Sequence, residues 1–249
     1  MDEANALLAD KRKLRKLKVQ DPGSGRRMSK RLEVVRLLKE RVGGEKLVEG
    51  WVEGPLAESA DLRGINTVML DLYDDPGFVR ELMAFIFKNA MSFAREQVKA
   101  GADVIGVGDA ASSLIGPELY REVVLEWEKR YVEAIHGMGA LVRLHICGDT
   151  NALFPLLAEV PADIVDLDSM ALIVDARARI GPTRLLSGNI DPVRVLQDGT
   201  PAVVTEALSQ CFADAGGRYY AACAGCEIPR GTPPANLEAM RDFARSRRE

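Results

Sequence analysis

The sequence predicts an α/β fold, a TIM-type (β/α)8 barrel that is incomplete here, with about six β/α units. Three observations predict it. Apolar runs typical of strands alternate with helical patterns along the chain, which is the order found in parallel sheets. Every run after the first is almost continuously apolar, as expected for strands that are buried on both faces. Polar residues follow the runs at their carboxyl ends, where β/α barrels build their active sites.

The number of strands leaves a second fold to consider. A closed parallel barrel normally has eight strands, and the sequence shows about six. A doubly wound open sheet is the competing fold. That fold is expected to carry a glycine-rich phosphate loop after its first strand, and none is present in this sequence. We therefore favour the barrel.

The chain is expected to divide near residue 45. Residues 1–45 form a helical and irregular N-terminal segment, and residues 46–249 form the barrel domain. Within the first segment, residues 29–42 place apolar side chains at helical spacing, and a Gly-Gly pair ends this helix. A basic run at residues 11–18 is typical of a solvated helix face.

Hydrophobic periodicity and turn residues define the elements of the barrel domain. A long helix at residues 75–99 has proline in its first turn and ends before a glycine. The predicted strands are residues 46–53, 102–107, 141–146, 163–167, 183–187 and 218–222. The other predicted helices are residues 117–137, 153–159, 175–180, 201–215 and 234–246.

The composition is that of an ordinary globular protein with one large core. The 249 residues are 47% hydrophobic and 28% charged, and the net charge is -4. This mild acidity argues against nucleic-acid binding, which usually needs a basic domain. No apolar run approaches the roughly 20 residues that span a bilayer, and the N-terminus has no signal-peptide pattern. Four cysteines in a chain of this length indicate a reducing cytoplasm, where cysteine clusters serve metals or catalysis.

A His-x-Cys pair stands at the end of the strand predicted at residues 141–146. Side chains alternate faces along a strand, so His145 and Cys147 point to the same side. A second cysteine, Cys226, follows the last predicted strand. If the two strand ends meet, these residues form a nitrogen and two-sulfur site with an open fourth position, which is the pattern of catalytic zinc.

Structural roles are the alternative for such residues. Free cysteine is among the most buried residue types, and a His-x-Cys pair by itself more often fills a core than binds a metal. The chain has two histidines, which excludes a His-rich metal site. We expect Cys223 to belong to the strand core, Cys211 to pack in a helix and His136 to be structural.

Other polar residues end strands on the face expected to carry the active site. We expect Glu53 and Asp109 to be catalytic, as a fourth zinc ligand or in contact with substrate. Capping of a turn or helix is the alternative for both residues. Asn189 and Asp168 are candidates for substrate binding, and Asp168 is also a candidate to orient a ligand histidine.

Two segments are distinctive as a pair: Leu-His-Ile-Cys-Gly at residues 144–148 and Gly-Cys-Glu-Ile-Pro at residues 225–229. On these segments the chain resembles the uroporphyrinogen decarboxylase superfamily, in particular its branch of cobalamin-dependent methyltransferases that includes methylcobamide:coenzyme M methyltransferases. The resemblance runs from about residue 10 to the C-terminus. The other matching segments are residues 50–55, 101–103, 108–109, 166–168, 188–192 and 232–234.

The resemblance implies a zinc ion bound by His145, Cys147 and Cys226. It also implies a methyl-corrinoid (cobalamin) donor carried on a separate corrinoid protein. The small-molecule methyl acceptor would be a thiol such as coenzyme M, or tetrahydrofolate. A metal lowers the pKa of a bound thiol, so its thiolate exists at neutral pH and can attack the methyl group.

Two other functions stay open. Porphyrinogen decarboxylation needs no metal, and the decarboxylases of the superfamily lack this cysteine pattern. The chain is alternatively a truncated, non-catalytic or partner-dependent member, because the resemblance implies two further strands ahead of residue 46 that are absent here. The six predicted strands would be the third to eighth strands of the family.

Two missing strands would leave the strands at residues 46–53 and 218–222 as sheet edges. An open side would also expose apolar residues that an intact barrel covers. The N-terminal segment could fold across the gap, a second copy could pair with it, or the edges could close on each other. We expect a homodimer, because the N-terminal segment is too charged to replace two buried strands.

Overall fold

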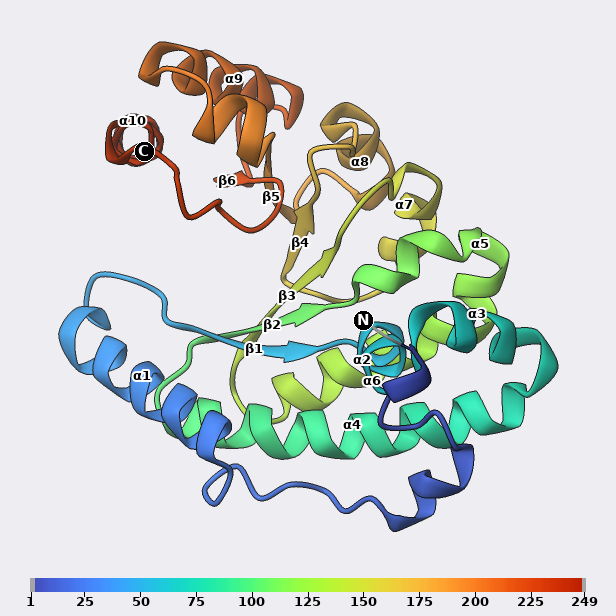
Figure 1. Cartoon of the computed structure of the whole chain (residues 1–249). Helices are drawn as coiled ribbons and strands as arrows, with labels where there is room; N and C mark the ends of the chain where they lie inside the picture. Colours follow the sequence, from blue (N-terminus) through green and yellow to red (C-terminus); the bar gives the residue numbers. More distant parts are fainter. Residues whose placement is uncertain (1–2, 248–249) are drawn as a thin grey trace. The chain divides into compact units, whose positions relative to one another are not determined.

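The structure is a computed structural model that describes residues 3–247. The outer ends of the two predicted segments, residues 1–2 and 248–249, lie outside the described residues. Strands and helices alternate along the chain, which confirms the predicted α/β class (Figure 1).

The sheet consists of parallel strands in chain order. The described residues form β1 (Glu49–Glu53), β2 (Val104–Gly108), β3 (Leu141–Ile146), β4 (Ile164–Leu167), β5 (Leu185–Ile190) and β6 (Tyr220–Ala224). Their order in the sheet is β1-β2-β3-β4-β5-β6. The register pairs Trp51 with Gly106 between β1 and β2, and Asp166 with Ser187 between β4 and β5. The six predicted strands are therefore confirmed, with shifts of a few residues at their ends.

Two compact units make up the chain, and the division falls within β3. The first unit consists of Met1–Leu144 and Val160–Ala162, and the second of His145–Glu159 and Asp163–Glu249. Residues 3–45 therefore belong to the same unit as β1 and β2. A separate segment at residues 1–45 stays a prediction.

Helices pack against the strands of the first unit. The long helix α4 (Pro76–Lys99) runs along β1, and the side chain of Asp75 caps its N-terminus (Figure 1). The predicted helix at residues 117–137 is interrupted by a π-helical turn. The remaining elements of this unit are η1 (Glu3–Asn5), η2 (Lys11–Lys16), α1 (Arg26–Val42), α2 (Pro55–Arg63), α3 (Ile65–Asp74), η3 (Ala110–Leu114), α5 (Gly116–Leu119), the π-helical η4 (Tyr120–Val124) and α6 (Leu125–His136).

The helices α2 and α3 are absent from the sequence prediction. Most side chains of α2 are buried, on several sides of the helix, so it lacks the one-sided apolar stripe that marks a surface helix. Gly64 ends α2 and begins α3 with a φ of 95°, a conformation that glycine adopts without strain. Burial on several sides thus explains why α2 was missed, whereas α3 buries only Val68, Asp71 and Leu72 and its omission has no such explanation.

The N-terminal segment packs on the first unit through a few buried contacts. Leu8, Leu14 and Val35 are buried in an otherwise polar stretch. The guanidinium of Arg63 donates to the carbonyl oxygen of Leu8 at 2.7 Å. Within the basic run, Lys11 forms an ion pair of 2.7 Å with Asp71. The basic run is therefore partly tied to the protein, and is not entirely a solvated face.

A side chain closes the outer edge of β1 at its centre. The side-chain oxygen of Gln97 accepts from the backbone N–H of Trp51 at 2.9 Å, and its nitrogen donates to the Trp51 carbonyl at 3.0 Å. Gln97 is 2% exposed. A Cβ on Gly50 would lie 2.6 Å from the Gln97 oxygen, so glycine makes room for this amide. The amide occupies the place that a neighbouring strand would take on an open edge.

The second unit carries β4, β5 and β6 with their helices (Figure 1). Its core includes Ile190 and Ala224 from the strands, with Leu208 and Phe243 from the helices that pack on them. The helical elements of this unit are η5 (Asn151–Leu153), α7 (Phe154–Leu157), α8 (Ile173–Ile180), the π-helical η6 (Pro192–Gln197), α9 (Pro201–Asp214) and α10 (Pro234–Ser246).

Candidate metal centre

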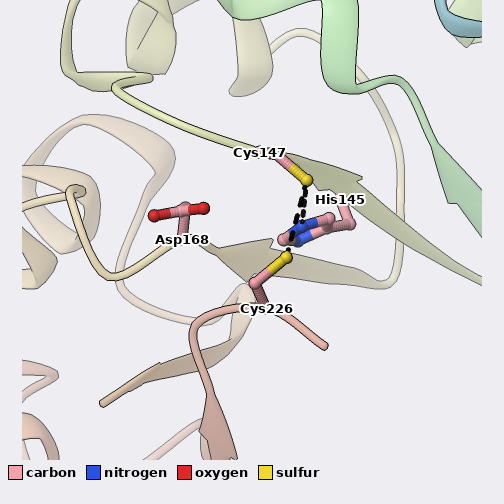
Figure 2. A group of neighbouring side chains, drawn as sticks. All are labelled: His145, Cys147, Asp168 and Cys226. Carbon is pink, nitrogen blue, oxygen red and sulfur yellow. Dashed lines mark hydrogen bonds between the residues drawn. The ribbon is translucent and has the colours of Figure 1, made fainter. Parts of the chain in front are cut away.

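The second unit brings four metal-capable side chains together at the carboxyl ends of its strands. His145 lies near the end of β3, Cys147 follows that strand, Asp168 follows β4 and Cys226 follows β6. One ligand atom of each residue lies within 4.8 Å of those of the others. Figure 2 shows the imidazole and both sulfurs directed at one another, with the carboxylate of Asp168 beside them. The predicted meeting of the two strand ends is therefore observed.

The distances inside this cluster are short. The Nε2 atom of His145 lies 3.1 Å from the sulfur of Cys147, and that sulfur lies 3.7 Å from the sulfur of Cys226. His145 and Asp168 are buried, whereas Cys226 is exposed. A ligand therefore has access to the cluster from the side of Cys226.

The other ring nitrogen of His145 is held by Asp166. The Nδ1 atom lies 3.0 Å from the Oδ2 atom of Asp166 and 3.2 Å from the Asp166 carbonyl oxygen. The hydroxyl of Ser187 donates to the Oδ1 atom of the same carboxylate. Asp168 was the candidate for orienting the histidine, and the structure shows Asp166 in that position instead.

The surroundings shift the pKa values of both His145 and Cys147. Burial by itself lowers the pKa of His145, but the hydrogen bonds and charges of Asp166 and Cys147 raise it to about 11. The hydrogen bond from the imidazole lowers the pKa of the Cys147 thiol against the effect of burial. The direction of the Cys147 shift favours its thiolate, which is the form of cysteine that binds metals.

The donor set and the spacing of its two sulfurs fit zinc. Two ligands about 2.3 Å from a tetrahedral zinc lie about 3.8 Å apart, close to the 3.7 Å between the two sulfurs. Imidazole and thiolate ligands suit zinc rather than the harder magnesium and calcium ions, and zinc also accepts a carboxylate oxygen. The cluster thus combines one imidazole and two cysteine sulfurs with a neighbouring carboxylate, a set that could hold a metal ion.

Asn189, predicted to bind substrate, is used to hold the loop that carries Asp168. Its side-chain nitrogen donates to the carbonyl oxygen of Asp168 at 2.8 Å and to that of Ala171 at 2.7 Å. The Oδ1 atom of Asp168 accepts from the backbone N–H of Met170 at 3.0 Å. These bonds fix Asp168 beside the cysteines. Substrate binding by Asn189 and Asp168 stays a prediction.

Asp109 lies in the first unit, where it caps a helix. It is 0% exposed, and its Oδ1 atom accepts from the backbone N–H groups of Leu56 and Ala57, in the first turn of α2. Its Oδ2 atom accepts from the hydroxyl of Ser112 at 2.8 Å. The contacts match the capping alternative, although the capped helix follows β1 rather than β2. A catalytic role for Asp109 stays a prediction.

Glu53, also in the first unit, lines a cavity of about 350 Å³ together with Trp51 and Glu58. The indole N–H of Trp51 donates to the Glu53 carboxylate at 3.1 Å. Burial raises the pKa of Glu53, and burial with the nearby acids Asp61 and Glu53 raises that of Glu58. A carboxyl group with a raised pKa in a cavity is compatible with a catalytic or binding role, which stays a prediction for Glu53.

The remaining cysteines lie outside the cluster. Cys211 packs on the core of the second unit, and its sulfur lies 3.6 Å from the Oδ1 atom of Asn189. Cys223 is half-buried in β6. Neither belongs to the group of ligand atoms around His145 among the described residues. A structural role for both cysteines stays a prediction.

The strands are parallel and alternate with helices, and a group of possible metal ligands follows the strands. These two features define the protein as a β/α-barrel type with a candidate metal centre. The chain belongs to the uroporphyrinogen decarboxylase (URO-D) family, whose sequence model matches residues 4–247. None of the helices in the described part of the chain has the length and apolar character of a membrane span.

Curated relatives in this family are methyltransferases and decarboxylases. The methylcobamide:CoM methyltransferase MtbA of Methanosarcina mazei is 32% identical over 219 residues, which cover 87% of this chain and 63% of that protein. A uroporphyrinogen decarboxylase of Nocardia farcinica is 30% identical over 206 residues, which cover 80% of this chain and 56% of that protein. The chain thus spans less than two thirds of the length of these relatives.

A solved structure supports the fold. A methyltransferase from Methanosarcina mazei superposes with a TM-score of 0.81 at 22% sequence identity, over 88% of this chain and 64% of that one. The family and this likeness show that the six-stranded sheet is a partial TIM-type barrel. The predicted incomplete barrel is therefore confirmed.

Proposed function

We propose that the chain belongs to a zinc-dependent methyltransferase that moves a methyl group from a methyl-corrinoid to a thiol of the coenzyme M kind. The observation that carries the proposal is the cluster of His145, Cys147, Cys226 and Asp168. The name of the relative MtbA supports the donor and the acceptor, because it states a methylcobamide and CoM. Tetrahydrofolate is the alternative acceptor.

In this proposal, the Nε2 atom of His145 and the sulfurs of Cys147 and Cys226 hold the zinc. Zinc bound there lowers the pKa of an acceptor thiol, so that its nucleophilic thiolate exists at neutral pH. Asp168, whose carboxylate belongs to the same group of ligand atoms, would be the fourth ligand in the absence of the acceptor. The exposure of Cys226 supports entry of the acceptor and the corrinoid from that side.

The proposed partners are a corrinoid protein, which presents the methyl donor, and a small-molecule acceptor. A reducing cytoplasm is the proposed location, which the four free cysteines support. Because the chain spans 63% of the MtbA relative, we propose that full activity requires further polypeptide, either from a longer chain or from a partner.

Zinc content and methyl transfer together test the proposal. We expect about one zinc per chain in the purified protein, and loss of the methyl group from a methyl-corrinoid when coenzyme M is added. Cys147→Ala should abolish zinc binding and methyl transfer, because it removes a thiolate ligand. Cys211→Ala should retain both, because Cys211 lies outside the cluster.

Full zinc content in Cys147→Ala would refute the ligand assignment. Zinc binding without methyl transfer, also in the presence of the polypeptide that completes the barrel, would refute the reaction. The second candidate, a decarboxylase, is favoured by the Nocardia farcinica relative. A metal-free protein that decarboxylates a porphyrinogen would establish that alternative.

A further inference from the structure

Three polar side chains form a buried line that ends at the metal cluster. Ser187 donates to the Oδ1 atom of Asp166, and the Oδ2 atom of Asp166 lies 3.0 Å from the Nδ1 atom of His145. Ser187, Asp166 and His145 are 4%, 5% and 6% exposed. Polar groups buried to this degree are costly unless each finds a partner, and this line satisfies all three.

We propose that Asp166, held in place by Ser187, is a positioning residue that fixes His145 as a metal ligand and sets the affinity of the cluster for zinc. This inference rests on the proposed function only in taking zinc as the ion. It assigns a role to two residues that contribute no ligand atom to the cluster.

The acceptors around Nδ1 determine which nitrogen carries the proton. A carboxylate oxygen and the carbonyl oxygen of Asp166 both lie within 3.2 Å of Nδ1, and both can only accept. Nδ1 must therefore donate, which leaves the lone pair of neutral His145 on Nε2. That atom lies 3.1 Å from the sulfur of Cys147, on the side of the cluster. This is the carboxylate–histidine arrangement that orients metal ligands.

The sheet places the two helper residues. Asp166 and Ser187 are register partners on β4 and β5, so their side chains stand next to each other on one face. His145 extends from β3 toward the same carboxylate. The hydroxyl of Ser187 occupies one oxygen of Asp166 and keeps the other directed at His145. The orientation of the histidine is therefore built into the sheet.

The test is zinc affinity, measured by competition with a chromogenic chelator. Asp166→Asn should weaken zinc binding by about 10–100-fold, because the amide can donate to Nδ1 and favour the wrong tautomer. Ser187→Ala should weaken binding less, and Ser187→Thr should restore it by returning the hydroxyl. Asp175→Asn, an exposed carboxylate in α8, is the matched control and should bind zinc like the wild type.

Cobalt substitution gives a second readout. The visible spectrum of the cobalt(II) protein should change in Asp166→Asn, because a displaced imidazole alters the ligand field, and should stay unchanged in Asp175→Asn. A folded Asp166→Asn protein with wild-type zinc affinity and cobalt spectrum would overturn the inference. If Asp166→Asn does not fold, equal zinc affinities of Ser187→Ala and Ser187→Thr would overturn it instead.

These outcomes are separate from those of the methyltransferase proposal. A protein that binds zinc, loses affinity in Asp166→Asn and transfers no methyl group would support the positioning role and refute the reaction. If the wild type transfers methyl groups and the zinc affinity of Asp166→Asn is unchanged, the reaction is supported and the positioning role is refuted.

Discussion

Gly225 shows how one residue can decide the geometry of the candidate metal centre. Its backbone N–H donates to the carbonyl oxygen of Ile190 at 2.8 Å, which extends the β6 pairing up to the residue before Cys226. A Cβ at this position would lie 2.3 Å from the backbone nitrogen of Ser169, next to Asp168. The two loops that carry the candidate ligands Asp168 and Cys226 therefore approach each other here more closely than any side chain allows.

Gly225→Ala should consequently harm both stability and metal binding. The added methyl group meets backbone rather than a flexible side chain, so we expect a loss of about 1–3 kcal/mol in the free energy of unfolding. Zinc content should fall as well, because Cys226 and Asp168 move apart. Gly44→Ala is the control, because no atom lies within 4 Å of its added Cβ. Equal unfolding midpoints and zinc contents for the two variants would contradict the prediction.

Among the secondary-structure elements, α6 carries a buried carboxyl group whose pKa is coupled to that of Asp109, the residue that follows β2 and caps α2. This group is Glu128, which accepts from the hydroxyl of Tyr120. Burial raises the pKa of Asp109 to about 6. Burial and the neighbouring Asp109 raise the pKa of Glu128 well above its ordinary value.

This pair should make the first unit less stable as the pH rises. The pKa of Asp109 is about 6 in the folded chain, against an ordinary value of 3.8 for an aspartate. Between these values the folded chain holds more protons, so the free energy of unfolding falls with rising pH, by at most about 1.4 kcal/mol per pH unit for each such group. Glu128 contributes in the same direction at higher pH.

Glu128→Gln tests this expectation. The variant removes one ionisable group and keeps an acceptor for Tyr120, so its unfolding free energy should decline less than that of the wild type between pH 4 and pH 8. Denaturant titrations at a series of pH values measure the difference. Glu126→Gln, on the exposed side of the same helix, should follow the wild-type curve. Parallel curves for Glu128→Gln and the wild type would show that Glu128 does not titrate in this range.

The helices and strands that were predicted correctly are those whose residue pattern lies within one short stretch of sequence. The period of α4 and the apolar run of β3 are properties of short stretches, and both were predicted within a residue of their ends. The helix α2 is buried on several sides, and its character depends on tertiary packing that leaves no period in the sequence.

The same limit applies to the metal cluster. His145, Cys147 and Cys226 can be picked out because each has the chemistry of a ligand and ends a strand. Asp166 is harder to find, because a carboxylate within a strand has no distinctive chemistry until its neighbour is known. Its alternation with Asp168 on one strand face was the available signal. Which of the two carboxylates meets Nδ1 depends on the register between strands.

For the molecule as a whole, assembly depends on the two edge strands of the sheet. Among the described residues, β1 and β6 are the two outermost strands of the sheet. Gln97 closes the outer edge of β1, so the homodimer expected from the sequence should use β6. The carbonyl oxygen of Tyr219 and the backbone N–H of Gly225 form hydrogen bonds with β5. In a parallel pair every second residue bonds to the neighbouring strand, so the backbone N–H and C=O of Ala222 point away from β5, toward the outer edge.

Light scattering at low micromolar concentration measures this assembly. We expect a mass near twice the 27.2 kDa of one chain. Ala222→Pro should shift it toward the single-chain mass, because proline removes an outward N–H and leaves the pairing with β5 intact. A wild-type mass of one chain, independent of concentration, would rule out the dimer. A dimer that persists in Ala222→Pro would place the interface elsewhere.

The amide of Gln97 has a further consequence for aggregation. In the terms of polymer chemistry, this amide acts as a chain terminator at the β1 edge of the sheet. Any strand that adds to β1 must first displace the two hydrogen bonds between Gln97 and the backbone of Trp51. Propagation of a fibril through stacked sheets requires both ends to be reactive. With β1 blocked, growth stops after one addition at β6, so a single buried glutamine can separate a defined pair of chains from an endless ladder.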